Sequence, residues 1–344
     1  MKKHTHYDRA DARAIREGGI ATAVMASGGT HFDSAEDASV FFARELDYVK
    51  AQSYDVEYPE LTALSLFPAS SEADEGAETI TYYTYDKTGV AKIIDNYSTD
   101  LPRADVDGTP SYAKIKSLGA SYGYSAQEMR ASRLAGKSLD SRKAESARYA
   151  IDSATNRIAW AGDEKSGLMG VLSKGQNIPL YTIQPNAAGK TSWLDKEADE
   201  ILDDINGMAK QVSRTTKNVE RPDTLAVPAD VYMHISTKRI PDTGITVLKF
   251  LLDNSPYIKE IVSAAELDAD SVDTNPYAAE GQGVAFLFTK DKRKLSLENP
   301  MPYNQYPVQV KGLETVVPCE ARTAGVIVYY PFSALIAVGV STNA

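Results

Sequence analysis

The stretch of sequence that decides the fold is residues 76–94, G-A-E-T-I-T-Y-Y-T-Y-D-K-T-G-V-A-K-I-I. β-branched and aromatic residues dominate 78–97, with a bulge or bend at 86–89, and this composition is typical of a β-strand. Residues 98–110 are rich in turn-forming Pro, Gly and Asp, and 111–124 again has strand composition. The pattern predicts a long β-hairpin whose arms of about 15 residues, at roughly 3.3 Å per residue, reach about 50 Å.

An isolated two-stranded ribbon of this kind is only marginally stable in water, so another surface has to cover one of its faces. Seven of the 20 tyrosines of the chain lie in it. Tyrosine suits surfaces that are buried on association, because it combines a large contact area with a polar tip, although strand propensity alone also favours it. The residues that we predict to contact another subunit are Tyr83, Tyr85, Lys87, Lys92, Tyr97, Arg103, Asp105 and Tyr112.

The segments on either side of the hairpin favour an extended arm and two helices. Residues 1–30 are rich in small residues and predict the arm, and 34–50 predict a short amphipathic helix behind the capping box of Asp33 and Glu36. A second capping box, Ser125 with Glu128, opens a helical stretch to about 161, with a break expected at Gly136. From 139 onward an Ala-rich apolar stripe predicts a long helix of about 22 residues, roughly 33 Å.

The second half of the chain mixes helices and strands. A third helix is expected to start at Thr191 or Ser192, with a strong apolar stripe from Leu194 to Val212, and a shorter one to span 246–252. The predicted strands are 224–227, 258–264, 283–288, 309–317 and 325–330.

Composition and charge narrow the class of protein. The net charge of −10 argues against a protein whose main task is to grip nucleic acid, which needs a basic face. The one basic segment is the first sixteen residues, with five Lys or Arg against two Asp, which fit a solvated tail or an inward-facing contact. Cys319 is the only cysteine, so no internal disulfide is possible, and no apolar run is long enough for a membrane span.

Motifs that could carry chemistry are weak. Gly189-Lys190-Thr191-Ser192 resembles the end of a phosphate-binding loop, but Gln184 stands where the first glycine is required, so a helix cap is the better interpretation and a nucleotide hydrolase using Lys190 the poorer one. The acidic run at 199–204 favours a solvated helix face over a metal site. We therefore predict no enzyme activity, no cofactor and no metal.

Several quoted stretches, in order and spacing, resemble a family of tailed-phage major capsid proteins that is related to encapsulin shells. Besides 76–94 they are F-F-A-R-E-L-D-Y-V-K (41–50), D-L-P-R-A-D-V-D-G (100–108), S-L-G-A-S-Y-G-Y-S-A-Q-E-M (117–129), A-G-K-S-L-D-S-R-K-A (135–144), N-R-I-A-W-A-G-D (156–163), M-P-Y-N-Q-Y-P-V-Q-V (301–310) and E-A-R-T-A-G-V-I-V-Y-Y-P (320–331). Residues 1–30 and 170–300 match less clearly.

The resemblance implies an α+β fold of the Hong Kong 97 type, with an N-terminal arm, an E-loop hairpin, a peripheral P-domain built on a long spine helix, and an axial A-domain. The ranges that it implies are 1–50 for the arm and short helix, 51–75 for the lead-in to the P-domain, 76–124 for the E-loop, 125–180 for the spine, 181–320 for the A-domain and 321–344 for C-terminal strands. Some relatives crosslink a loop lysine to a neighbour, but no motif here identifies such a pair, so no crosslink is predicted.

The function that the resemblance implies is self-assembly into the icosahedral shell of a tailed phage around double-stranded DNA. The expected partners are other copies in hexamers and pentamers, DNA by weak inner-face contact only, and portal, scaffold or decoration proteins. The expected location is the virion, with assembly in the host cytoplasm and no membrane contact. An encapsulin-like compartment around a cargo enzyme is the alternative.

Overall fold

The computed structural model describes residues 58–93, 103–135 and 142–342. The chain divides into two units, Met1–Tyr58 and Pro59–Ala344, and the description below concerns the second. The predicted arm at 1–30, the predicted helix at 34–50 and the candidate contact residue Tyr97 lie outside the described residues.

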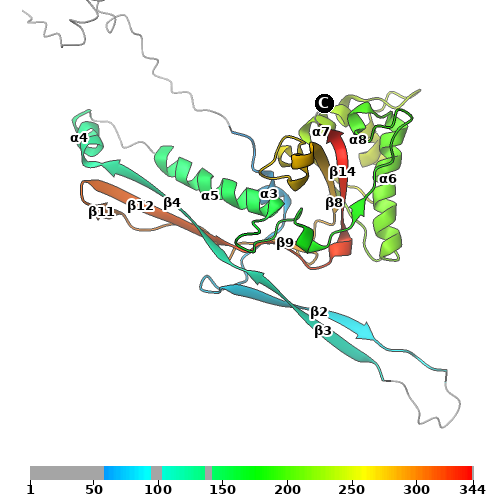
Figure 1. The fold of residues 1–344 in the computed structure, drawn as a ribbon, viewed down its shortest axis with the longest axis horizontal. Helices are drawn as coiled ribbons and strands as arrows, with labels where there is room; N and C mark the ends of the chain where they lie inside the picture. Colours follow the sequence, from blue (N-terminus) through cyan, green and yellow to red (C-terminus); the bar gives the residue numbers. More distant parts are fainter. Residues whose placement is uncertain (1–57, 94–102, 136–141, 343–344) are drawn as a thin grey trace, which may run out of the picture. The chain divides into compact units, whose positions relative to one another are not determined.

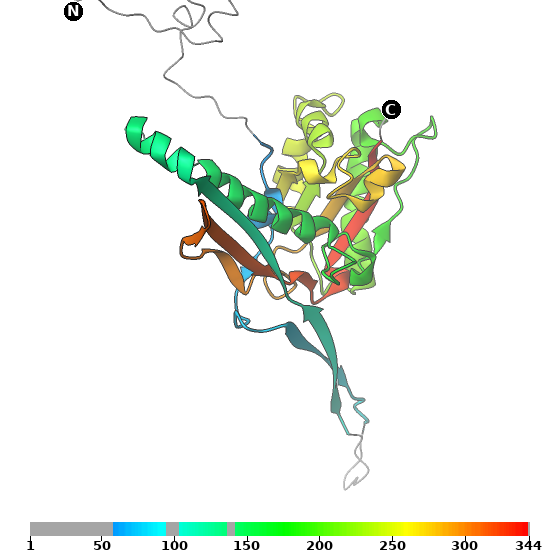
Figure 2. The same cartoon turned by 60° about the vertical axis from the view of Figure 1, so that its left-hand side comes forward.

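The predicted hairpin is a two-stranded antiparallel ribbon of β2 (Thr79–Thr88) and β3 (Asp105–Lys114), which extends away from the rest of its unit (Figures 1 and 2). The turn expected at 98–110 is wrong in its second half, because Asp105 onward belongs to β3. Pro110 has no backbone N–H, but among the described residues β3 has no second neighbouring strand that would need this donor. Gly108 is covered by the ring of Tyr85 on the paired strand.

The second arm of the predicted hairpin, 111–124, is two strands with different partners. After Ile115 the chain continues as β4 (Lys116–Ser125), which pairs along its whole length with β12 (Glu314–Thr323) instead of with β2. β10 (Met301–Gln305) and β11 (Gln309–Lys311) pair with the other edge of β12, which completes a four-stranded sheet. The strand expected at 309–317 is instead a hairpin, because Gly312 turns the chain at a φ of 63°.

The helical stretch expected at 125–161 is described as α4 (Ala126–Ala135) and α5 (Arg142–Ala161), with 136–141 outside the described residues. The Ser125–Glu128 capping box is confirmed by reciprocal hydrogen bonds of 2.9 and 3.1 Å. Along the apolar stripe of α5, Ala147 and Ile151 pack on the four-stranded sheet, whereas Ala159 and Trp160 pack in a second core further along.

That second core lies against a five-stranded sheet in the order β5–β14–β8–β6–β7. Its strands are β5 (Leu180–Tyr181), β14 (Ala334–Thr342), β8 (Gln282–Phe288), β6 (Thr224–Val227) and β7 (Glu260–Ser263). The other face is covered by three helices, α6 (Ala198–Thr215), α7 (Ala229–Thr237) and α8 (Val247–Asn254). The short helix α3 (Thr62–Leu66) joins the α5 side, next to a small sheet of β1 (Ala69–Ser70), β9 (Leu295–Glu298) and β13 (Gly325–Val328).

One further difference from the sequence expectations concerns this half of the chain. The third helix begins at Ala198, not at Thr191 or Ser192; Ser192 instead caps the short 3-10 helix Trp193–Asp195. The strands within residues 181–320 belong to several sheets, since β10–β12 form a sheet with β4, and β9 pairs with β1 and β13. Among the described residues no helix is long and apolar enough to cross a membrane.

Candidate assembly surface

The ribbon has two chemically different faces. Directly opposite residues of an antiparallel pair share a face, and the pairs Tyr83–Pro110 and Tyr85–Gly108 fix which residues these are. One face, here called the aromatic face, carries Tyr83, Tyr85, Lys87, Val106, Pro110 and Tyr112. Its tyrosines are 57%, 70% and 69% exposed, and the first two rings stack with centroids 6.2 Å apart. This much exposed aromatic surface is typical of a contact that is completed by a partner.

The opposite face is acidic at its far end and anchored at its base. Asp86, Asp105 and Asp107 lie on it, and Asp86 and Asp107 are directly paired. At the base, Tyr82 meets Tyr329 of the main body edge-to-face at 5.1 Å, so this face turns toward its own subunit. The aromatic face therefore points away from the body that carries it.

A second surface lies on the four-stranded sheet, on the side away from α5. The residues of β4 that face α5 are Leu118, Ala120 and Tyr122, so the alternate residues point outward. All of these outward residues are small: Ser117, Gly119, Ser121, Gly123 and Ser125. Of these, Ser117, Gly119 and Ser121 line a shallow hollow of about 590 Å³ with Tyr306, Pro318 and Glu320, here called the trough.

The trough carries a fixed negative charge at one side. The Tyr306 hydroxyl donates to Glu320 at 2.8 Å, and hydrogen bonds from Ser117 and Tyr306 hold the pKa of Glu320 below its ordinary value. Glu320 is therefore ionised at neutral pH. A floor of small residues and a carboxylate at the edge suit a partner with bulky rings and a cation.

The two surfaces cannot meet within one chain. Only Ile115 separates β3 from β4, and the two strands continue in roughly one direction. The ribbon therefore lies at one end of this long strand pair and the trough at the other (Figures 1 and 2). An aromatic face can reach a trough only on a different copy.

The structure thus brings four of the eight predicted contact residues onto one face: Tyr83, Tyr85, Lys87 and Tyr112. Asp105 lies on the opposite face, Lys92 and Arg103 lie outside the paired strands, and Tyr97 is outside the described residues. Sequence reasoning missed the trough, although the S-x-G-x-S-x-G-x-S alternation at 117–125 is visible in the sequence.

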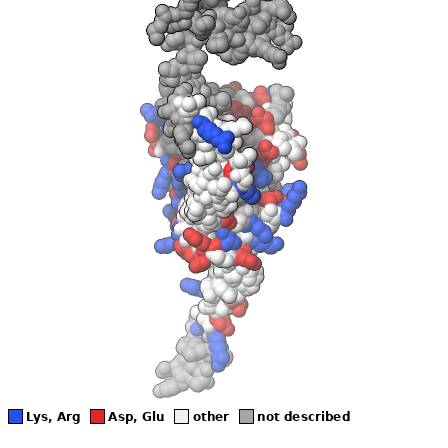
Figure 3. Space-filling view, turned by 90° about the vertical axis from the view of Figure 1, so that its left-hand side faces the viewer, with Lys and Arg blue, Asp and Glu red and all other residues white. Residues whose placement is uncertain are grey.

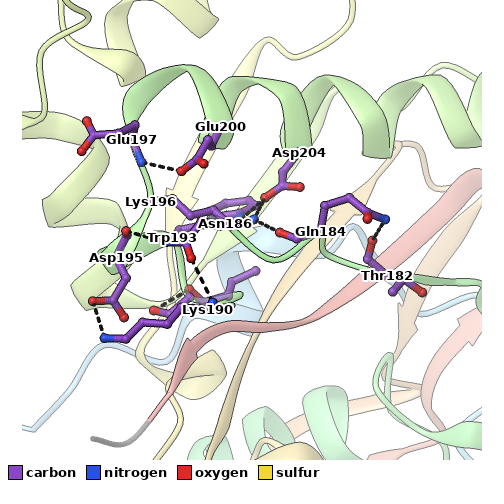
Figure 4. A network of polar contacts seen from close by, with 12 residues as sticks. Thr182, Gln184, Asn186, Lys190, Trp193, Asp195, Lys196, Glu197, Glu200 and Asp204 are labelled. Atoms are coloured by element: carbon purple, nitrogen blue, oxygen red, sulfur yellow. Dashed lines mark hydrogen bonds and ion pairs between the residues drawn. The ribbon is translucent and has the colours of Figure 1, made fainter. Parts of the chain in front are cut away.

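The prediction that the acidic run at 199–204 lies on a solvated helix face is partly wrong. Asp204 is buried and pairs at 2.5 Å with buried Lys196, which also donates to the Gln184 carbonyl, and the Trp193 indole donates to Asp204 at 3.0 Å (Figure 4). Lys190 pairs with Asp195 at 3.0 Å in an exposed turn, which is no phosphate cradle. Within the described ranges no group of three or more His, Cys, Asp or Glu is arranged to hold a metal ion.

Charge is mixed on the side of the described residues that Figure 3 shows. Lys and Arg are interspersed there with Asp and Glu rather than gathered into one broad area. This side therefore does not offer the broad basic face that strong binding of nucleic acid requires.

The chain is similar to solved shell subunits over nearly its whole length. It matches the capsid of Myoviridae phage XM1 with a TM-score of 0.73 at 18% identity, covering 88% of this chain and all of that one. For the capsid of a native GTA particle the TM-score is 0.60 at 10% identity, with 90% and 100% covered. For a virus-like particle from Pyrococcus furiosus it is 0.51 at 12% identity, with 80% and 91% covered. These likenesses confirm the predicted α+β fold of the Hong Kong 97 type.

The sequence comparison identifies the family. The family model described as major capsid protein matches residues 89–340, and the chain belongs to that family. It is a phage shell-forming protein of the virion, as the resemblance implied, and the encapsulin-like alternative is not favoured. None of the curated protein sequences matches the chain.

Proposed function

We propose that copies of this chain join head to tail, the aromatic face of one ribbon lying in the trough of the next copy, to form the hexamers and pentamers of an icosahedral shell around double-stranded DNA. The observation that carries the proposal is that one chain bears two complementary surfaces that it cannot bring together itself. The role is structural rather than enzymatic.

The complementarity is both steric and electrostatic. Tyr83 and Tyr112 project from the ribbon, and the trough floor of Gly119 and Ser121 leaves room for such rings. Lys87 shares the aromatic face, and the ionised Glu320 lies beside the trough. Aromatic side chains that fill pockets lined by backbone contribute a large share of binding energy at protein interfaces.

A head-to-tail contact uses different surfaces on the two partners, so repetition gives a closed ring when the rotation between copies closes. Each copy then contributes one ribbon and one trough. Many such contacts of modest strength add up to a stable shell through multivalency.

The DNA contact that we propose is weak and confined to the inner face. A net charge of −10 and mixed surface charge suit a wall that encloses DNA without adhering to it. Assembly in the host cytoplasm and association with portal, scaffold or decoration proteins are part of the same proposal, which membership of the major capsid protein family supports.

The test uses one variant for each surface. Tyr83→Ser with Tyr112→Ser removes two rings from the aromatic face, and Asp107→Asn on the opposite face of the same ribbon is its control. Gly119→Leu places a bulky side chain in the trough, and its Cβ has room because the nearest heavy atom outside the adjacent residues is 4.0 Å away. Gly244→Leu, at a glycine with open space around it, is the matched control.

Each surface variant is expected to remain folded and to lose shells in electron micrographs, with association weakened by about tenfold or more, whereas both controls assemble. Mixing the two surface variants leaves one intact ribbon and one intact trough. Analytical ultracentrifugation should then show dimers that do not grow into rings. Normal shells from either surface variant, or no dimer in the mixture, would contradict the proposed contact.

A further inference from the structure

The carboxylate of Glu266 links three segments that are far apart in the sequence. It lies on the short helical turn Ala265–Leu267 beside the five-stranded sheet. It accepts hydrogen bonds from the Thr62 amide at 3.0 Å, the Thr62 hydroxyl at 2.7 Å and the Asn156 side-chain amide at 2.7 Å. Thr62 opens α3 and Asn156 lies in α5, so one buried side chain joins α3, α5 and this turn.

Asn156 completes the arrangement. Its side-chain oxygen accepts from the Ala63 amide at 2.9 Å, so the first two amides of α3 are satisfied by side chains from elsewhere in the fold. A five-residue helix is too short to be stable by itself, so these bonds hold α3 in place. Thr62, Asn156 and Glu266 are all buried, and together they are called the clasp below.

The clasp lies where α5 passes from one core to the other. Ala147 and Ile151 pack on the four-stranded sheet, Ala159 and Trp160 pack on the five-stranded sheet, and Asn156 stands between these two parts of the helix. Apolar packing is non-directional and permits small rotations, whereas buried hydrogen bonds hold only in one arrangement because breaking them leaves polar groups unsatisfied.

We propose that the clasp sets the angle between α5 and the five-stranded sheet, and that this angle determines the curvature of the shell. The inference rests on the proposed function, because the trough lies on the four-stranded sheet that packs on the first part of α5. A change of angle at the clasp is repeated in every copy, so it changes the shell diameter before it prevents assembly. Thr62, Asn156 and Glu266 are positioning residues in this sense.

The central variant is Asn156→Leu, which keeps the size of the side chain but removes its donor and its acceptor. Thr62→Val removes one donor and serves if Asn156→Leu does not fold, as judged by circular dichroism. Glu266→Gln is the conservative control: its oxygen accepts from Thr62 and Asn156, and its amide can donate to the Thr62 hydroxyl. Ile235→Ala, at a buried side chain of α7 in the core on the other face of the five-stranded sheet, is the control for lost stability alone.

The measurement is the distribution of shell diameters by cryo-electron microscopy. Clasp variants and the Ile235→Ala control are compared where their unfolding temperatures are equal, so that lost stability alone does not account for a difference in diameter. We expect Asn156→Leu and Thr62→Val to give shifted or mixed diameters, and Glu266→Gln and Ile235→Ala to give the wild-type diameter. Wild-type diameters from both clasp variants, or an equal shift in Ile235→Ala, would overturn the inference. Failure of the wild-type protein to form shells would instead contradict the proposed function.

Discussion

At the scale of single residues, the buried ion pair of Lys196 and Asp204 is expected to be sensitive to the loss of either partner. Both side chains are at most 4% exposed, and two further bonds, from the Trp193 indole and to the Gln184 carbonyl, satisfy the pair (Figure 4). The pair holds the segment before α6 against that helix. Its net contribution is small, because desolvation offsets the attraction, but removal of one partner leaves an uncompensated buried charge.

Asp204→Ala is therefore expected to lower the free energy of unfolding by about 3–5 kcal/mol, because Lys196 loses its counter-ion. Guanidinium unfolding of the unassembled subunit measures this. Asp203→Ala, the exposed neighbour on the same helix, is the control and should change stability by less than about 0.5 kcal/mol. Equal stability of the two variants would show that Lys196 finds another partner.

The stability of the subunit is expected to depend on pH through the carboxyl group of Asp268. It accepts from the Ala229 amide at the start of α7, but burial raises the pKa of its carboxyl from 3.8 to about 6, and the charges of Asp230, Asp270 and Glu266 add to the rise. The folded state thus binds a proton more readily than the unfolded state between pH 3.8 and about 6. The contribution of Asp268 to stability is full below this window and is lost as pH rises through it.

Asp268→Asn should then be more stable than the wild type at pH 7.5, by about 1 kcal/mol after allowance for solvent screening, and equal to it near pH 4. The asparagine oxygen can still accept from Ala229, so the helix start is kept. Thermal unfolding at several pH values gives the comparison. A stability difference that does not change with pH would show that the carboxyl titrates normally.

At the scale of elements, the ribbon differs from every other part of its unit. β2 and β3 pair only with each other, whereas β6, β8 and β14 lie inside the five-stranded sheet with buried side chains. Two strands alone are marginal in water, so the ribbon depends on the neighbouring copy for its stability.

Hydrogen exchange should show this difference. In the unassembled subunit the amides of Thr79–Thr88 and Asp105–Lys114 are expected to exchange much faster than those of β8, and in the shell they should become protected. The central sheet should change little on assembly. Equal protection of the ribbon before and after assembly would mean that no neighbour covers it.

The elements that sequence analysis described well were those with a local signal in the sequence. Residues 79–85 are all β-branched or aromatic, which indicates a strand, and the apolar residues of α6 repeat at helical spacing. The partner of β4 did not follow, because β12 lies almost 200 residues further on and nothing in the local pattern selects it. Gly108 and Pro110 suggested a turn because both residue types are common in turns. They fit in β3 because this strand has only one neighbour, β2, in the described part of the chain, and the local sequence does not show this.

The same limit applied to the candidate site. The exposed tyrosines were predicted from composition, but their common face required the register of β2 and β3. Asp204 was expected on a solvated face because its burial depends on Lys196, which reaches it from the preceding loop. Sequence periodicity describes one element at a time, and a binding surface made by several elements needs their packing.

At the scale of the whole molecule, the proposed head-to-tail contact joins two different surfaces of the same chain. The ribbon projects in one direction and the trough lies in the other, so in this proposal each copy gives its ribbon to one neighbour and its trough to another (Figure 1). Buried cores cover both faces of the five-stranded sheet, whereas the aromatic face of the ribbon stays exposed in the single subunit.

A cryo-electron microscopy map of shells formed by the purified chain tests this most directly. The map is expected to show closed shells in which the ribbon of a neighbouring copy covers the outer side of β4, with the rings of Tyr83 and Tyr112 over Gly119 and Ser121. Shells in which this side of β4 is bare, or is covered by another part of the neighbour, would contradict the head-to-tail contact.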